Sequence, residues 1–164
     1  MEEEHYCSDP DRVRIIDGVP EALTRLKNAG YCLVIITNQS GIGRGYFQVS
    51  DYEAVHERLI TLLGPGVISA SYYCPDAPGI PSTRRKPEPG MVLEAARDLD
   101  LDLTRSWFVG DKAVDVECGR RAGARSILVR TGHGQSEDPA GAEFVAKDFA
   151  SAAELILRTS DASP

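Results

Sequence analysis

The pattern of apolar and polar positions shows two apolar runs that each lead into hydrogen-bonding or charged residues. Residues 33–36 are apolar without polar alternation, and residues 37–41 that follow are small or hydrogen-bonding. A strand without alternation is covered on both faces, as in a parallel sheet between helices. A second run, residues 106–110, leads into Asp111 and Lys112. Because ligands bind beyond the carboxyl ends of such strands, the pattern predicts that both ends face one site.

The rest of the chain alternates between helical and extended patterns. Prolines, glycines and a capping-box signal formed by Ser50 and Glu53 mark the expected boundaries. Expected helices cover residues 19–28, 50–63 and 90–99, a stretch through 116 and 118 to 122, and about 149–157. Expected strands cover 31–37, 67–74, 106–110 and 126–129, and the apolar residues 144–146 precede the last helix. Residues 1–17, the glycine-rich residues 41–45 and residues 75–81 are expected to be irregular. This alternation predicts an α/β fold: a doubly wound, mostly parallel, Rossmann-like sheet flanked by helices, with right-handed crossovers.

Length and charge narrow the class of protein. A chain of 164 residues, with 42% hydrophobic and 26% charged residues, fits one compact domain. The formal net charge of −7 argues against nucleic acid or an anionic membrane as a partner. The basic cluster Arg84, Arg85 and Lys86 still offers a local site for an anion.

Cysteine usage and hydropathy bear on the compartment. The chain has no apolar stretch of about 20 residues, no charged-then-apolar leader and no paired cysteine spacing. We therefore expect a reduced, cytoplasmic protein without membrane span or anchor. The four cysteines are Cys7, Cys32, Cys74 and Cys118.

The two strand ends carry groups suited to a phosphate. Asp111 and Asp115 lie on either side of one helical turn, and carboxylates at a strand end suit Mg²⁺, which binds carboxylates, water and substrate phosphate. Lys86 and Lys112 can neutralise a phosphoryl group, while Thr37 and the amides of residues 38–41 can hydrogen-bond it. Together these groups indicate a phosphoryl-transfer site. Taken singly, Thr37 could begin a turn and Asp111 could cap a helix.

Four ordered motifs resemble the haloacid dehalogenase-like phosphatases. They are residues 37–45, residues 73–75, residues 85–91, and residues 109–112 with Asp115. Within that superfamily they are similar to the branch of histidinol phosphatases and D-glycero-D-manno-heptose 1,7-bisphosphate phosphatases. The resemblance extends over nearly the whole chain.

The resemblance implies a role for each matching residue. Thr37 corresponds to the hydroxyl that binds the phosphate and Lys86 to the lysine of the third motif, and we class both as catalytic. Asp111 corresponds to a magnesium ligand, and Asp115 supports the lysine or the metal. The residues expected to contact substrate or order the site are Asn38, Gln39, Ser40, Arg44, Arg85 and Lys112. For Arg44 and Arg85 a solvated surface charge is the alternative.

The chain departs from the family in its first motif. Family members attack phosphorus with an aspartate of an Asp-x-Asp-Gly motif at the end of a central strand, and this chain shows no such strand. Asp9 and Asp11 imitate the spacing but follow no apolar run. The family pattern places the motif upstream of Met1, so we expect a misplaced start or a truncation. The hypothesis is that the chain is inactive as written, with a central strand missing, and that an upstream-extended version is a phosphatase.

The second departure concerns the loop that holds zinc in many relatives. Only Cys74 remains there, with Asp76, Ser82 and Arg84 near the other ligand positions, so magnesium but no zinc is expected. The expected substrate is a small phosphorylated sugar or amino alcohol, first heptose 1,7-bisphosphate and then histidinol phosphate. A non-catalytic phosphate-binding relative and a protein-interaction domain are the alternatives from other classes. A monomer is expected.

Overall fold

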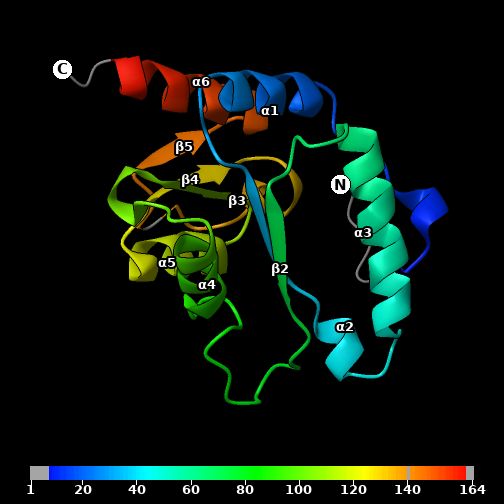
Figure 1. Cartoon of the computed structure of the whole chain (residues 1–164). Helices are drawn as coiled ribbons and strands as arrows, with labels where there is room; N and C mark the ends of the chain where they lie inside the picture. Colours follow the sequence, from blue (N-terminus) through cyan, green and yellow to red (C-terminus); the bar gives the residue numbers. More distant parts are fainter. Residues whose placement is uncertain (1–7, 140, 162–164) are drawn as a thin grey trace.

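In a computed structural model, which describes residues 8–139 and 141–161, parallel strands lie between two layers of helices (Figure 1). The strands are β1 (Val34–Asn38), β2 (Ala70–Cys74), β3 (Trp107–Gly110), β4 (Arg125–Val129) and β5 (Phe144–Ala146). The α-helices are α1 (Val19–Asn28), α2 (Ser40–Gly43), α3 (Val49–Leu63), α4 (Gly90–Asp98), α5 (Ala113–Ala122) and α6 (Phe149–Asp161). Short 3-10 turns occupy Pro10–Arg12, Leu103–Arg105 and Gly132–Gln135.

The helices cover the strands in pairs. Helices α1 and α6 lie together on one face, where α6 contacts β3, β4 and β5, while α4 and α5 cover the other face (Figure 1). Helix α4 contacts β1 and β2, and α5 contacts β3 and β4. Helix α3 packs on β2 through Tyr52, whose ring lies 4.6 Å from that of Tyr73 between centroids. None of the helices in the described ranges is both long and apolar enough to cross a bilayer.

The core lies between β4, β5, α1 and α6. Ile127 of β4 is completely buried and packs in this cluster with Ala152 of α6, and the neighbouring Leu128 is also completely buried. Burial on both faces agrees with the three consecutive apolar residues, 127–129, that end β4. β4 lies at the centre of its sheet, and the short strand expected over residues 126–129 is present.

The strands form two separate sheets within the described residues. β1 pairs with β2, and β3, β4 and β5 pair in that order, with every pairing parallel. β1 and β3 each have one strand neighbour, and a cavity of about 1000 Å³ lies between them. Every residue of β1 and β3 is only half-buried, in contrast to β4. The expectation that residues 33–36 form a strand buried on both faces is therefore wrong here, because the cavity replaces one neighbour.

Most of the expected elements are present, and the α/β class with parallel strands between helices is confirmed. Several local expectations are wrong. Residues 41–45 are not wholly irregular, since α2 forms one helical turn there. The capping box of α3 is formed by Gln48 and Asp51, two residues earlier than expected. Strands β1 and β2 begin three residues later than expected, and α6 extends four residues further, to Asp161.

The packing of α5 on the sheet requires glycine at position 119. A Cβ atom at Gly119 would lie 2.5 Å from Phe108 Cβ and 2.5 Å from Ser126 Oγ. Gly119→Ala is therefore expected to lower the free energy of unfolding by about 1–3 kcal/mol, although helix propensity alone favours alanine by about 1 kcal/mol. Urea unfolding measures the change. The control Val114→Ala, on the exposed part of α5, should stay within about 0.5 kcal/mol, and an unchanged Gly119→Ala variant would contradict this packing.

Candidate active site

The predicted site residues gather at one edge of the strands. Thr37 and Asn38 end β1, Asp111 follows β3, and Asp115 lies in the first turn of α5. The loop from β2 to α4 carries Arg85 and Lys86, and it lies at the same end of the strands as α2 (Figure 1). The expectation that two strand ends serve one site therefore agrees with the arrangement of the elements.

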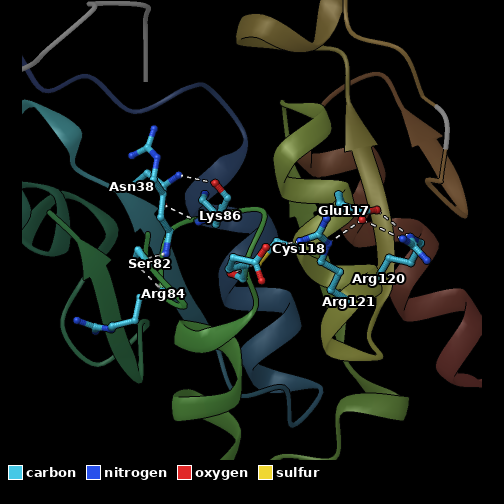
Figure 2. Close-up of polar contacts among 10 residues, drawn as sticks. Asn38, Ser82, Arg84, Lys86, Glu117, Cys118, Arg120 and Arg121 are labelled. Atoms are coloured by element: carbon cyan, nitrogen blue, oxygen red, sulfur yellow. Dashed lines mark hydrogen bonds and ion pairs between the residues drawn. The ribbon is translucent and has the colours of Figure 1, made fainter. Parts of the chain in front are cut away.

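Asn38 holds the backbone of Lys86. Its amide Nδ2 donates to Lys86 O at 3.1 Å, and its Oδ1 accepts from Lys86 N at 3.0 Å (Figure 2). These two bonds join residues 48 positions apart in sequence. Asn38 thus fixes the backbone of Lys86, while its expected role toward substrate stays a prediction.

Lys86 and Asp115 form an enclosed ion pair at the site. The Lys86 ammonium lies 2.7 Å from Asp115 Oδ1, and it donates to Ile36 O at 3.0 Å. The side chains of Lys86 and Asp115 are only 12% and 7% exposed, so their attraction is weakly screened. The other carboxylate oxygen of Asp115 accepts from Lys112 N at 3.1 Å. Asp115 therefore supports the lysine, and both of its oxygens already have partners.

Gly110 lets Asp115 reach this position. A Cβ atom at Gly110 would lie 2.3 Å from Asp115 Cβ and 2.5 Å from its Oδ2. Any larger residue would push the first turn of α5 away from the end of β3. The glycine is thus needed for close approach.

The Thr37 hydroxyl is oriented by its neighbour. Gln39 Nε2 donates to Thr37 Oγ1 at 3.0 Å. Because that oxygen accepts here, its own proton remains available for an oxyanion. Gln39 and Ser40 stand at the start of α2, directly after β1.

The segment after β4 fixes Asp111, which sequence reasoning did not anticipate. His133 N donates to Asp111 Oδ2 at 3.0 Å. Gly132, at a φ of 58°, approaches so closely that a Cβ atom would lie 2.5 Å from Asp111 Oδ2. Arg130 braces this turn by donating to Gly134 O at 2.7 Å and to Glu137 O at 2.8 Å. Gly132 and Gly134 were the sequence signal that could have indicated this contact, because close approach of the backbone requires glycine.

A magnesium ion fits this carboxylate. Asp111 is half-buried at the strand end, and its Oδ2 accepts from one backbone amide, which leaves further lone pairs for a ligand. Mg²⁺ often takes only one or two protein carboxylates, with water and substrate phosphate completing its shell. Within residues 8–139 and 141–161, no group of three or more His, Cys, Asp or Glu side chains is positioned to hold a metal. The metal role expected for Asp115 stays a prediction.

The other basic residues near the site differ from Lys86 in their partners and in their exposure. Arg85 donates to Asp76 O at 2.9 Å and so shapes the loop, whereas Arg84 pairs with Glu94 at 3.0 Å. Arg44 is exposed directly after α2, and Lys112 is half-buried at the start of α5. The structure therefore places Lys112 at the strand end, while the substrate roles of Arg44 and Arg85 remain predictions.

Cys74 is a buried thiol at the end of β2. Its Sγ donates to Asp76 Oδ2 at 3.3 Å and lies 3.6 Å from Ser82 Oγ. A hydrogen bond from Ser82, and then the one from Cys74, lower the pKa of Asp76. The residues that the sequence placed near the zinc-ligand positions thus form a hydrogen-bonded cluster.

Comparison with known proteins identifies the class and then the family. The HAD-hydrolase-like family model matches residues 83–152, which include Lys86, Asp111 and Asp115. A D-glycero-D-manno-heptose-1,7-bisphosphate 7-phosphatase of Thermosynechococcus vestitus is 38% identical over 170 residues, covering 92% of this chain and 87% of the relative. Its counterpart in Chlorobaculum tepidum is 42% identical over 144 residues, which cover 79% of this chain and 72% of that relative. The chain belongs to this family of heptose bisphosphate phosphatases within the HAD-like hydrolases.

Solved structures agree with this assignment. The D,D-heptose 1,7-bisphosphate phosphatase of B. bronchiseptica, crystallised with magnesium and phosphate, superposes with a TM-score of 0.87 at 34% identity. The match covers 97% of this chain and 92% of that protein. The expected superfamily and branch are therefore confirmed.

The enclosed pair of Lys86 and Asp115 makes a stability prediction. Lys86→Met leaves an unpaired buried carboxylate and is expected to cost about 3–5 kcal/mol of unfolding free energy. Adding Asp115→Asn removes that charge but keeps an acceptor for Lys112 N, so the double variant should recover most of the loss. Denaturant unfolding measures both, with the exposed Lys147→Met as control. A double variant no more stable than Lys86→Met would show that the pair does not couple.

Proposed function

We propose that this chain carries the phosphate- and magnesium-binding half of a phosphatase that removes the 7-phosphate from D-glycero-D-manno-heptose 1,7-bisphosphate. The observation that carries the proposal is the convergence of Thr37, Lys86 and Asp111 at one strand edge, in a chain similar to enzymes named for this reaction. A hydroxyl, an ammonium and a metal carboxylate together match the charge of a transferring phosphoryl group.

Each residue contributes a defined interaction. Thr37 donates its hydroxyl proton to a phosphoryl oxygen, because Gln39 occupies its acceptor side. Lys86, held by Asn38 and Asp115, supplies a fixed positive charge that needs no rearrangement as the phosphoryl group becomes more charged. Asp111 would hold Mg²⁺, which neutralises phosphate charge when bound.

The attacking group is the part that the described residues do not supply. Covalent phosphoryl transfer needs a carboxylate in line with the leaving oxygen. The Asp115 carboxylate pairs with the Lys86 ammonium and accepts a hydrogen bond from Lys112 N, and Asp111 accepts one from His133 N. Asp9 and Asp11 lie around the 3-10 turn Pro10–Arg12, which contacts α3. The chain alone is therefore proposed to be inactive, and an upstream extension ending in Asp-x-Asp-Gly to be active.

Phosphate release tests the function directly. The 164-residue chain and the extended chain are assayed with Mg²⁺ on heptose 1,7-bisphosphate and on histidinol phosphate. We expect turnover by the extended chain alone, with the heptose ester preferred. In the extended chain, Asp111→Asn should lower kcat by about 10²–10³-fold, whereas the exposed Glu53→Gln should have no effect.

Three other outcomes would change the conclusion. Preference for histidinol phosphate would reassign the substrate. Phosphate binding without turnover by either chain would identify a non-catalytic phosphate-binding relative. Full turnover by the short chain, lost on substitution of Asp9 or Asp11, would overturn the proposed source of the nucleophile.

A further inference from the structure

The segment after β4, residues 131–137, contacts the corner between β3 and α5 at two points. The first contact is the hydrogen bond from His133 N to Asp111 Oδ2, at 3.0 Å. In the second, Ala113 N at the start of α5 donates to Glu137 Oε2 at 3.1 Å. We call residues 131–137 the covering segment. It holds both the expected magnesium ligand and the start of the helix that follows this ligand.

The first amide of α5 has no acceptor within its own helix. The first N–H groups of a helix lack a carbonyl one turn earlier. Lys112 N is satisfied by Asp115 Oδ2 at 3.1 Å, whereas Ala113 N receives its acceptor from Glu137, 24 positions further along the chain. A carboxylate is a strong acceptor there, because it bonds the amide and also complements the positive end of the helix dipole. Glu137 is therefore a long-range cap of α5.

The backbone of the covering segment is fixed independently of this side chain. Arg130 Nη1 donates to Gly134 O at 2.7 Å and to Glu137 O at 2.8 Å. A Cβ atom at Gly134 would lie 1.8 Å from Val129 O and 3.4 Å from Asp111 O, so the segment packs directly on the end of β4 and on the residue after β3. The Glu137 carboxylate thus reaches the first amide of α5 from a fixed position.

We propose that Glu137 is a positioning residue for magnesium, which holds Ala113 N and thereby keeps the Asp111 carboxylate oriented toward the ion. Glu137 acts through the backbone and does not itself bind the metal. Within the described ranges, it belongs to no group of three or more possible ligand side chains placed to hold a metal. The proposal rests on the proposed function, in which Asp111 is the magnesium ligand.

A magnesium site with few protein ligands depends on how each ligand is oriented. Mg²⁺ demands near-octahedral geometry and is bound through one or two carboxylates. Groups that orient a metal ligand from outside the coordination shell alter metal affinity by about 10–100-fold when they are removed. Asp111 lies between the last residue of β3 and the start of α5, so strand pairing fixes it on one side and the helix start on the other. Loss of the Glu137 contact would release the second side.

A magnesium titration of the 164-residue chain measures this effect, with Mg²⁺ alone as the probe. NMR shifts of the Asp111 and Lys112 amides report binding, and Asp111→Asn defines the loss of the site. We expect Glu137→Ala to raise the Kd for Mg²⁺ by about tenfold. Glu137→Gln keeps an oxygen acceptor for Ala113 N and should stay within about threefold of the wild-type Kd.

Ala113→Pro removes the other partner of the contact and leaves the helix intact. Proline is favoured at the first helical position, where its missing N–H is not needed by the helix. Lys112 has a φ of −127° and a ψ of 149°, the extended conformation that a residue before proline adopts. Ala113→Pro should therefore raise the Kd as much as Glu137→Ala does, and the double variant should show no further loss. The exposed Ser136→Ala, next to Glu137, is the control and should bind Mg²⁺ as the wild-type chain does.

Amide exchange separates positioning from general destabilisation. In Glu137→Ala, exchange of the Ala113 amide should quicken by about tenfold or more, while the Ile127 amide in the core keeps its wild-type rate. If the core also loses protection, Ala113→Pro decides between the two roles. A tenfold weaker magnesium affinity in Ala113→Pro then supports the proposal, and an unchanged affinity overturns it.

Three other results would overturn the proposal. Equal weakening by Glu137→Gln and Glu137→Ala would assign the effect to charge and not to the contact with Ala113 N. Additive losses in the double variant would show that the two residues act separately. Unchanged magnesium affinity of Glu137→Ala, in a chain that binds Mg²⁺, would overturn this proposal alone. A wild-type chain whose Asp111 amide does not respond to Mg²⁺ would overturn the magnesium role in the proposed function as well.

Discussion

The arrangement of the site depends on the interactions of the Lys86 ammonium, because they connect the two sheets. The ammonium bonds Ile36 O in the first sheet and Asp115 in the helix that packs on the second. Asn38 fixes the lysine backbone from the end of β1. Thr37 directly follows Ile36 in β1, and Asp111 directly follows β3 ahead of Asp115 in α5. A buried charge such as the Lys86 ammonium is stable only while its partners remain, so the sheets and the site are energetically linked.

Close backbone approach supplies the second constraint. Gly110 lets the Asp115 carboxylate lie against the end of β3, and Gly132 lets the turn after β4 cover Asp111. In each case the space that a Cβ atom would take is filled by a carboxylate. The acidic groups are therefore held by backbone amides and by neighbouring packing, which keeps them oriented for a cation or phosphate. The tight turn after β4 gives Arg130 a purely structural part in this arrangement.

Part of this account could be predicted from the amino-acid sequence. The alternation of helices and strands and the motifs around Thr37, Lys86 and Asp111 led to the correct fold class and family, because these signals are local. The half-burial of β1 could not be predicted from its own residues, since it depends on which strand occupies the next position. The pairing of Asn38 with the Lys86 backbone joins residues 48 positions apart, so no local pattern encodes it. The glycines at positions 132 and 134 were visible, but their contact with Asp111 required the fold.

The central claim is that Thr37, Lys86 and Asp111 form one phosphate site. The most direct measurement is an NMR titration of the 164-residue chain with inorganic phosphate in Mg²⁺, observing backbone amides and the Lys86 ammonium. The account predicts saturable shifts, with one common midpoint, at the Lys86 ammonium and at the amides of Thr37, Ser40 and Asp111. Shifts confined to the exposed arginines, with the Lys86 ammonium unchanged, would contradict it.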